Sequence, residues 1–339
     1  SLSIKIIITT ITILGAYMKK IIILLFFVLS ISLYSQEYKW YKGNIHTHTN
    51  HSDGDEYPER VVQWYKDHEY NFLVITDHNI LTETKYLDYN GNEDNFILIA
   101  GEEVTSNYNK KPVHLNGINI KKVVPALKGN SVSETIQKNI DAILEAGGIA
   151  MLNHPRWRKA ITANDVIGIK NCDLLEVYNY NQSSNNFAAG GEESTEMFWD
   201  RLLSKNMKLW GTATDDTHNY IGEFSYNKAN PGKGWVVVRA KELTPDAITN
   251  ALKNGDFYAS VGVVLKDIKI TDKEYKIEIV ADSMMNYTTF FIGKDGKVLK
   301  EDYSHTPSYQ FKGDELYVRA RIFCSSGEFA ITQPYFLKK

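Results

Sequence analysis

The chain has 339 residues, of which 43% are hydrophobic, 12% aromatic and 23% charged, and its formal net charge is −3 at pH 7. This composition excludes an intrinsically disordered chain and a collagen-like repeat, and the charge offers no basic footprint, so no nucleic-acid partner is expected. With two cysteines, Cys172 and Cys324, a disulfide framework and a cysteine-rich zinc site are also excluded. The length suggests about two domains.

The beginning of the chain reads as a secretory leader. Met18 is followed by two lysines, by the apolar run Ile21–Leu29 and by small or polar residues up to Ser35. This order is typical of a signal peptide, and the apolar run is shorter than the roughly 20 residues of a membrane span. We therefore expect residues 1–36 to be a leader cleaved near Ser35, and the protein to be exported without a stable membrane span. Residues 1–17 precede this Met and are interpreted as upstream translation.

Residues 37–262 alternate short apolar segments with helical patterns. Several segments are continuous apolar runs, which are typical of strands buried on both faces. Pro58, the pair Ser131 and Glu134, and Thr244–Pro245 indicate the starts of helices between them. This alternation predicts a parallel α/β sheet, either open or closed into a barrel. The predicted strands are Gly43–His48, Phe72–Thr76, Phe96–Gly101, His114–Ile118, Gly148–Leu152, Leu174–Val177, Leu209–Thr212 and Trp235–Arg239.

After residue 262 the pattern changes to strands without intervening helices. Tyr275–Ala281 and Leu316–Ile322 alternate apolar with polar residues, as half-buried strands do. Asp295–Gly296 is a strong hairpin signal between two further apolar segments. We therefore predict a small antiparallel β-sandwich over residues 263–339.

Imidazole and carboxylate side chains recur along the predicted strands of residues 37–262. One residue separates His46 from His48, so on a strand both rings face the same side and can reach one cation. Similar groups follow on the other strands, mostly at the carboxyl end, where barrels build their active sites. The candidates are His46, His48, Asp53, Asp77, His78, Glu102, Glu103, His114, His154, Glu176, Asp215, Asp216 and His218.

Such a cluster points to a metal site with more than one ion. Charged and imidazole side chains on buried strand ends are costly unless they are paired or bind a metal. Histidine with carboxylate and without thiolate suits Zn²⁺, Mn²⁺ or Fe²⁺ and disfavours a structural zinc site. Each position alone is a weak signal, because a lone histidine is usually structural, but the repetition over successive strands favours a site for two or three divalent ions.

The motifs resemble those of PHP (polymerase and histidinol phosphatase) domain metal-dependent hydrolases, and most closely a secreted CehA/McbA-like subgroup. The resemblance covers roughly residues 43–260 and implies a distorted (β/α)₇ barrel over residues 37–262. The family's Gly-x-Glu falls on Glu103 and its Asp-x-His on Asp216 and His218. The motifs that carry the resemblance are HTHTNHSDG (46–54), TDHN (76–79), GEE (101–103), HLNGINI (114–120), NHP (153–155), EVYN (176–179) and DDTH (215–218).

Carried onto this sequence, the resemblance implies three metal ions. Glu103 would bridge two of them. The implied ligand sets are His46, His48, Glu103 and Asp216 for the first ion, Glu103, His114 and His154 for the second, and Asp53, His78 and His218 for the third. For Asp77 and Asp215 we expect either orientation of neighbouring imidazoles or charge balance. Glu176 lies between apolar residues and is expected to bond nearby backbone or a metal ligand.

Clustered divalent ions generate a metal-activated hydroxide and neutralise the oxygens of an in-line displacement, and the resemblance also implies phosphoester hydrolysis. Asp53, His78 and His218 are the candidates for helping to protonate the leaving alkoxide through a metal-bound water. Phosphatase-like members of the family often place Arg directly after His-Pro-x, where this chain has Trp157 between Arg156 and Arg158. We therefore expect a small-molecule substrate, phosphorylated, gripped by one of these arginines or stacked on Trp157.

Two alternatives stay open at this point. A metal-activated hydroxide also attacks carbonyl groups, so the same site could hydrolyse a carboxyl ester or a carbamate. The chain could instead be a non-catalytic surface binding module, with structural metals in the barrel and a β-sandwich that recognises a glycan or another partner. The sequence gives no oligomeric state.

Overall fold

The computed structural model describes residues 18–20, 37–85, 87 and 95–337. Apart from Met18–Lys20, the predicted signal peptide lies outside the described residues. Among the helices that the structure describes, none combines the length and the apolar character that a membrane crossing needs. Cys172 and Cys324 are both buried and both free.

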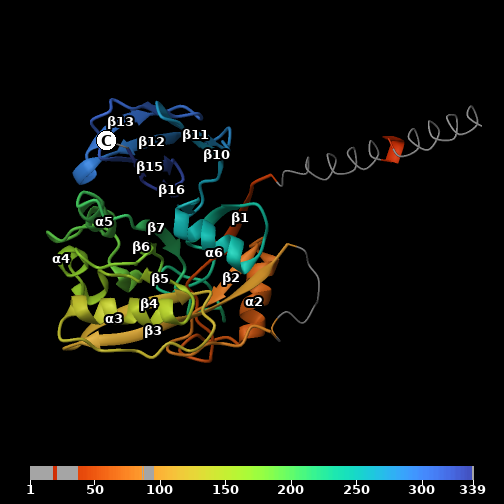
Figure 1. Ribbon diagram of the computed structural model, residues 1–339, viewed down its shortest axis with the longest axis vertical. Coiled ribbons are helices and arrows are strands. Elements are labelled where there is room, and N and C mark those ends of the chain that lie inside the picture. The colour runs from red at the N-terminus through yellow and green to blue at the C-terminus, as the bar shows by residue number, and fades with distance from the viewer. Residues whose placement is uncertain (1–17, 21–36, 86, 88–94, 338–339) are drawn as a thin grey trace, which may run out of the picture. The chain divides into compact units, whose positions relative to one another are not determined.

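The strands of the first part form a sheet in which β8, β1, β2, β3, β4, β5, β6 and β7 are neighbours in this order. Figure 1 labels β1 to β7 of this sheet. β1, β2 and β3 are parallel, as are β5, β6 and β7, whereas β8 runs antiparallel to β1. Parallel strands bring their carboxyl ends to one edge, where ligands commonly bind. The strands are β1 (Lys39–Asn44), β2 (Phe72–Ile75), β3 (Ile97–Tyr108), β4 (Lys111–Ile118), β5 (Ile149–Leu152), β6 (Leu174–Asn179), β7 (Trp210–Thr214), β8 (Trp235–Ala240) and β9 (Phe257–Ser260).

Besides β8, strand β4 departs from the predicted parallel order, because it is antiparallel to both β3 and β5. β3 runs on past Gly101 to Tyr108 and returns as the antiparallel strand β4. The two residues between them, Asn109 and Lys110, both have positive φ, at 47° and 67°, as a two-residue hairpin turn requires. A link of this length cannot connect parallel strands. The prediction of a short third strand was therefore wrong, and Glu102 and Glu103 lie inside β3 instead of closing it.

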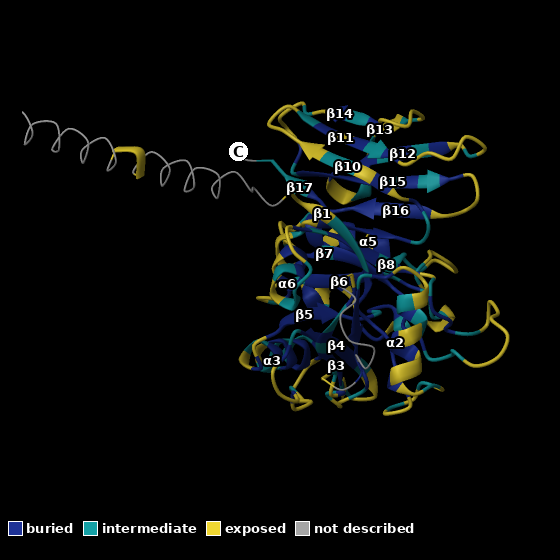
Figure 2. Cartoon of the chain, turned by 90° about the vertical axis from the view of Figure 1, so that its right-hand side faces the viewer, coloured by how far each residue is buried: buried dark blue, intermediate teal, exposed yellow. Residues whose placement is uncertain are grey.

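The helices pack on the outside of this sheet, with their apolar faces turned inward. On α3 the buried residues Ile136, Ile140 and Ile143 join Val113 and Leu115 of β4 in one core cluster. Figure 2 shows this division, with buried strands inside and an exposed outer face on α2. The helices are α2 (Pro58–Asp67), α3 (Val132–Glu145), α4 (Ala163–Val166), α5 (Thr195–Leu203) and α6 (Pro245–Asn254), with 3-10 turns η1 (Trp157–Lys159) and η2 (Gln182–Ser184).

The C-terminal strands form two antiparallel layers that share an apolar core. β10, β11 and β14 make one sheet, and β12, β13, β15 and β16 continue the barrel sheet, because β16 pairs with β9. The predicted hairpin at Asp295–Gly296 is confirmed by the pairing of β12 with β13. The boundary at residue 262 stays a prediction. The elements are β10 (Leu265–Ile270), β11 (Glu274–Ile279), β12 (Tyr287–Ile292), η3 (Lys294–Gly296), β13 (Val298–Asp302), β14 (Ser308–Gln310), β15 (Tyr317–Cys324), β16 (Phe329–Thr332) and β17 (Tyr335–Phe336).

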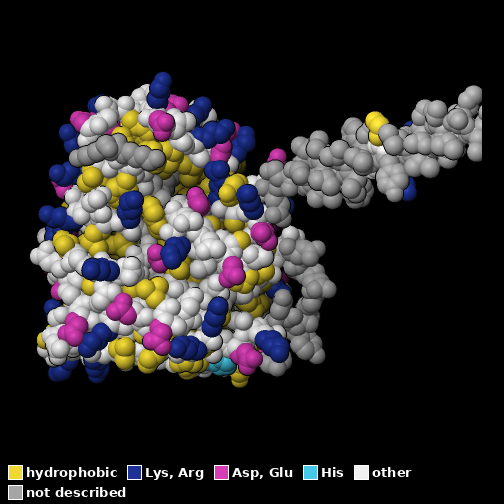
Figure 3. All heavy atoms as spheres, viewed as in Figure 1, with side chains coloured by type: hydrophobic (Ala, Val, Ile, Leu, Met, Phe, Trp, Pro, Cys, Tyr) yellow, Lys and Arg dark blue, Asp and Glu magenta, His cyan; other side chains and the backbone are white. Residues whose placement is uncertain are grey.

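The surface seen in Figure 3 mixes both signs of charge. Lys and Arg side chains are interspersed with Asp and Glu over this face, with hydrophobic side chains among them. The fold therefore places the concentrated acidic and imidazole groups inside, at the carboxyl edge of the parallel strands, and leaves a mixed surface on this side.

Candidate metal centre

The first two imidazoles come from the extended segment that directly follows β1. His48 N–H donates to Thr217 O at 2.9 Å and Asp216 N–H donates to His46 O at 3.1 Å, so this segment bonds to the loop after β7. β1 itself ends at Asn44, and the prediction that both histidines lie on the strand was wrong. Their backbone is nevertheless extended, so both buried rings face the same side, and each Nε2 lies within 3.2 Å of Asp216 Oδ1.

Glu103 stands at the centre of the cluster. Its carboxylate is 1% exposed, and it projects from β3 among five imidazoles that come from four different segments. Each carboxylate oxygen faces its own set of ring nitrogens, which is the arrangement of a carboxylate that bridges two cation positions. The distances to Oε2 are 3.5 Å from His46 Nε2, 3.4 Å from His48 Nε2 and 3.0 Å from His78 Nδ1, and those to Oε1 are 3.1 Å from His114 Nδ1 and 3.2 Å from His154 Nε2.

A second group lies on the more open side of the cluster. Asp53 Oδ2 is 3.4 Å from His78 Nε2, and Asp53 Oδ1 is 3.4 Å from His218 Nε2 and 3.6 Å from His48 Nδ1. The side chain of Asp53 is 54% exposed, that of His78 25% and that of His218 21%, whereas His48 is fully buried. Solvent therefore reaches the cluster from the side of Asp53, His78 and His218.

The charges of this group depend on one another. Burial opposes ionisation of Asp53, but hydrogen bonds from His218 and His78 hold its pKa well below the usual range. Burial lowers the pKa of His78, but the charges of Glu103 and Asp53 outweigh it and raise this pKa to about 10. For His218, burial is likewise outweighed by Asp53 and Asp216, and its pKa rises to about 9. Without metal, the protons on His78 and His218 thus offset the negative charge of the carboxylates, as bound cations would.

Two observations indicate that the residues fit divalent cations. His46 Nε2 and Glu103 Oε2 are buried, face each other and have no hydrogen-bond partner among the described residues. An unsatisfied buried pair of this kind is costly without a cation between the atoms. In addition, His154 and Asp216 hold positive φ, at 21° and 48°. Strained backbone at non-glycine residues is common where a site imposes the geometry.

The candidate ligands form four overlapping groups, and within each group the ligand atoms lie within 4.8 Å of one another. The groups share members, and they bring together every residue predicted as a metal ligand. They are His48, Asp53, His78 and His218; His46, His154 and Asp216; His46, His48 and Glu103; and His78, Glu103 and His114.

Glu176 hydrogen-bonds two of the candidate ligand residues, His46 and His154. Its Oε1 lies 2.8 Å from Nδ1 of His46 and accepts a bond from Thr214 Oγ1, and its Oε2 accepts from the backbone N–H of His154 at 2.6 Å. This carboxylate therefore bonds both a ligand ring and ligand backbone, as the sequence led us to expect. A carboxylate behind a metal-binding imidazole fixes the ring and its tautomer.

Two asparagines also hold the carboxylates in place, and the sequence analysis assigned them no role. Asn153 Nδ2 donates to Glu103 Oε1 at 2.9 Å, and Asn179 Nδ2 donates to Asp216 Oδ2 at 3.1 Å and to Glu176 Oε2 at 2.9 Å. The available sequence signal for such a role was the position of Asn153 next to His154 and of Asn179 at the end of β6. The direction of an amide two strands away cannot be read from spacing.

For Asp77 and Asp215 we expected either orientation of imidazoles or charge balance, and the structure shows each of them bonded to loop residues. Asp77 accepts bonds from Thr49 N–H and Oγ1, both at 2.8 Å, and from Ser52 Oγ at 2.8 Å, and so holds the loop that carries Asp53. Asp215 accepts three backbone N–H bonds from residues 232–234, at 2.6 to 2.9 Å. Both carboxylates shape the loops around the site.

Glu102 lies on the other face of β3 from Glu103. Its Oε2 accepts a bond from Val124 N–H at 3.0 Å. Burial raises the pKa of Glu102 to about 7, although the Val124 bond opposes this rise. The alternation of side chains along a strand thus separates the two neighbours, and Glu103 is the one that faces the imidazoles.

Of the three residues proposed to contact substrate, Trp157 lies against the cluster. Its ring centroid is 5.3 Å from that of His114 and 5.4 Å from that of His154. The Arg158 guanidinium lies 4.6 Å from the Trp157 ring centroid. Arg156 is buried, and its Nη2 donates to Glu192 Oε2 at 2.6 Å. The structure therefore places an indole, with a cation stacked on it, beside the metal ligands.

Comparisons with known proteins bear on the fold. The search of protein families finds no matching profile, and no curated protein matches the sequence. Among solved structures, the chain is similar to a two-domain protein from Bacteroides vulgatus that is predicted to contain a PHP-like metal-dependent phosphoesterase. The TM-score is 0.50 at 16% identity, over 88% of this chain and 95% of that chain.

Two further solved structures align less well. One, described as a metal-dependent phosphoesterase from Bifidobacterium adolescentis, has a TM-score of 0.40 at 15% identity, over 56% of this chain and 92% of its own. The other, an amidohydrolase from Chromobacterium violaceum with bound sulfate and no metal, has a TM-score of 0.37 at 12% identity, over 55% and 93%. These two alignments carry no argument below. The Bacteroides vulgatus structure confirms the predicted fold class, a mixed α/β fold with C-terminal antiparallel strands.

Proposed function

We propose that the chain is an exported metal-dependent phosphoesterase. The observation that carries the proposal is the placement of Glu103, whose two oxygens face separate sets of imidazoles in a buried cluster. The fold, which resembles that of a PHP-like protein, supports the same reading. Export rests on the sequence of residues 18–35 alone.

Two or three ions of Zn²⁺, Mn²⁺ or Fe²⁺, held by the residues above, would supply an activated water and neutralise the charge of a phosphate ester. The ligand sets that we propose are the three implied by the sequence, with Glu103 as the bridge.

The residues on the open side then serve the leaving group. When water oxygen attacks phosphorus and the P–O bond to the alcohol breaks, the departing oxygen needs a proton. Asp53, His78 and His218 form a connected group with contacts of 3.4 Å, on the exposed side where an alcohol would depart. We propose that this group orients a water molecule, which gives that proton to the departing oxygen.

Trp157 and Arg158 extend the same site toward the rest of the substrate. An indole beside His114 and His154 offers an apolar surface to the part of the molecule next to the phosphate, and the Arg158 side chain reaches over it. We propose a small phosphorylated substrate with a planar or ring-shaped group at this position. Arg156 is a weaker candidate for gripping phosphate, because Glu192 already neutralises it.

The proposal is tested with the full chain loaded with Zn²⁺, Mn²⁺ or Fe²⁺ in turn. The substrates are 4-nitrophenyl phosphate, bis(4-nitrophenyl) phosphate and 4-nitrophenyl acetate, with His46→Ala as the metal-site control. We expect cleavage of a phosphate ester that His46→Ala abolishes. Cleavage of the acetate alone would favour the carboxyl-ester alternative, and no cleavage of any of the three would favour a binding module.

Export is tested separately. The full chain with a C-terminal tag is expressed in a Gram-negative host and the cell fractions are compared with those of a variant in which Leu24 and Leu25 are both replaced by Arg. We expect a shortened chain outside the cytoplasm for the unmodified leader, and full-length chain in the cytoplasm for the variant. Retention of the unmodified chain in the cytoplasm contradicts export.

A further inference from the structure

A second site lies where the barrel meets the C-terminal strands. The structure has a cavity of about 330 Å³ there, within the size range of small-molecule sites. Its walls include Trp40 at the start of β1 and Trp210 at the start of β7, whereas the metal ligands follow the carboxyl ends of these strands. At a rise of about 3.3 Å per residue, the six residues from Trp40 to His46 put about 20 Å between this cavity and the metal cluster.

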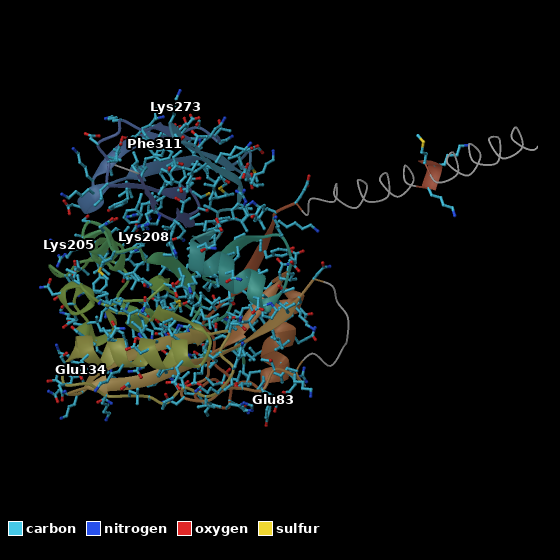
Figure 4. All side chains as sticks on the ribbon, in the orientation of Figure 1. Glu83, Glu134, Lys205, Lys208, Lys273 and Phe311 are labelled. Carbon is cyan, nitrogen blue, oxygen red and sulfur yellow. The ribbon has the colours of Figure 1, made fainter. Side chains whose placement is uncertain are left out.

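Aromatic rings line the cavity, and the indole N–H groups of its two tryptophans are already bonded. Trp40 Nε1 donates to Lys266 O at 3.1 Å, and Trp210 Nε1 donates to Lys253 O at 2.8 Å. Tyr335 comes from β17 and stacks on Phe311 at 5.4 Å between centroids; Phe311 is labelled among the C-terminal strands in Figure 4. These bonds fix the rings, so the groups left to meet a ligand are their carbon faces.

The position of the Trp210 ring is set by a glycine. Gly255 ends α6 with φ of 77°, and a Cβ atom built on it would lie 2.8 Å from the indole of Trp210. Any larger residue would meet this ring and also strain the backbone. The floor is equally fixed, because the side-chain amide of Gln333 exchanges two bonds of 2.8 Å with the backbone of Gly211.

The remaining polar groups stand at the rim and carry opposite charges. Asn254 and Asp256 are exposed at the end of α6, and Arg239 of β8 lies beside them, with its backbone N–H donating to Asp256 O at 2.8 Å. The Arg239 guanidinium is already engaged, because its Nη1 donates to Ile268 O at 3.4 Å and lies 3.9 Å from Asp267 Oδ1. The Asp256 carboxylate at the rim therefore favours an uncharged ligand over a phosphate. Amide, carboxylate and guanidinium groups together supply both donors and acceptors.

We propose that this cavity binds the ring of a neutral sugar, so that the protein attaches to a saccharide. A pyranose ring has an apolar C–H face, which suits the flat carbon surfaces of Trp40, Trp210 and Tyr335, and a hydroxyl edge, which suits Asn254 and Asp256. The site is distinct from the metal centre, and the proposal does not depend on phosphoester hydrolysis.

The test is affinity electrophoresis of the full chain in native gels that contain soluble starch, mannan, arabinoxylan or mixed-linkage β-glucan. We expect at least one of these neutral polymers to retard the protein. Asp256→Ala and Asn254→Ala, which change exposed side chains, should each weaken binding about tenfold, as expected for the loss of a hydrogen bond to a ligand. Tyr303→Ala, which removes an aromatic side chain that is 69% exposed on β13's outgoing loop, should bind as the unmodified chain does.

The outcomes are decisive without any activity assay. Retardation that Asp256→Ala and Asn254→Ala weaken and Tyr303→Ala preserves supports the site. No retardation by any of the four polymers contradicts it, as does retardation that both rim variants leave unchanged. A chain that hydrolyses phosphate esters and binds none of these polymers would retain the proposed function and refute the saccharide site.

Discussion

Oε1 of Glu176 lies 2.8 Å from Nδ1 of His46, and both side chains are fully buried. This contact assigns the proton of the neutral ring to Nδ1 and leaves the Nε2 lone pair directed at Glu103 and Asp216, which lie 3.5 Å and 3.2 Å away. The tautomer that a metal needs is therefore set by a residue that is not itself a ligand.

Glu176→Gln should therefore weaken metal binding. The amide would place an NH₂ group toward the donors that Glu176 now accepts from, and the ring of His46 would lose its anionic partner. We expect metal affinity to fall about 10–100-fold, as for other carboxylates behind metal-binding histidines. Competition with a chelator measures this affinity, and Glu145→Gln, which changes an exposed ion pair with Lys122, is the matched control. Equal affinities for both variants would refute the positioning role.

Metal uptake should release protons. The pKa of metal-free His78 is about 10 and that of His218 about 9, so both rings carry protons at pH 7 that a metal ion must displace. Apparent metal affinity should thus rise with pH until these groups are deprotonated. Calorimetry in two buffers with different ionisation enthalpies measures the release. The exposed-loop variant His305→Ala should release as many protons as the unmodified chain, and binding without net proton release at pH 7 would contradict the assignment.

Trp157 should discriminate between substrates. If its indole supports a ring next to the phosphate, Trp157→Ala lowers kcat/KM for phenyl phosphate more than for methyl phosphate. A stacking contact of about 0.5–1.5 kcal/mol corresponds to a further loss of about 2- to 10-fold. Trp157→Phe should recover most of this difference. An equal loss for both substrates, with metal content unchanged, would place Trp157 outside the substrate site.

The junction between α5 and β15 depends on a buried ion pair. The Arg319 side chain is 1% exposed, and its Nε and Nη2 donate to the two oxygens of Asp200 at 2.8 Å and 2.6 Å. Asp200→Ala leaves this cation without its main partner and should cost about 3–5 kcal/mol of unfolding free energy. Urea denaturation measures the loss.

The matched control for this pair is exposed. The Arg201 side chain is 53% exposed and forms an ion pair with Glu193. Arg201→Ala removes this pair and should cost less than about 1 kcal/mol of unfolding free energy. The double variant Asp200→Leu with Arg319→Met should recover much of the stability lost in Asp200→Ala. Similar losses for Asp200→Ala and Arg201→Ala would mean that the buried pair does not hold this junction.

The sequence predicted the class of fold and the meeting of distant ligands, because strand ends and hydrophobic runs are local signals. It missed the turn at Asn109 and Lys110, since asparagine and lysine also occur freely in loops, and so it missed that β3 continues through Glu103. It misjudged where β1 ends, because the segment that carries His46 pairs with a loop after β7.

The supporting polar contacts were harder to foresee. Asn153 and Asn179 reach carboxylates on other strands, and the direction of a side-chain amide follows from packing in three dimensions. Likewise, Asp215 bonds backbone N–H groups of residues 232–234, which only the folded loop brings to it. Spacing along the chain thus identified the ligand types, whereas the hydrogen bonds that hold them required the structure.

The most direct test of the metal centre is anomalous diffraction from crystals of the full chain grown with Mn²⁺ or Zn²⁺. The account predicts at least two anomalous peaks, one bound by Glu103 Oε2 with His46 and His48, and one by Glu103 Oε1 with His114 and His154. Peaks found only elsewhere, or none at saturating metal, would contradict it.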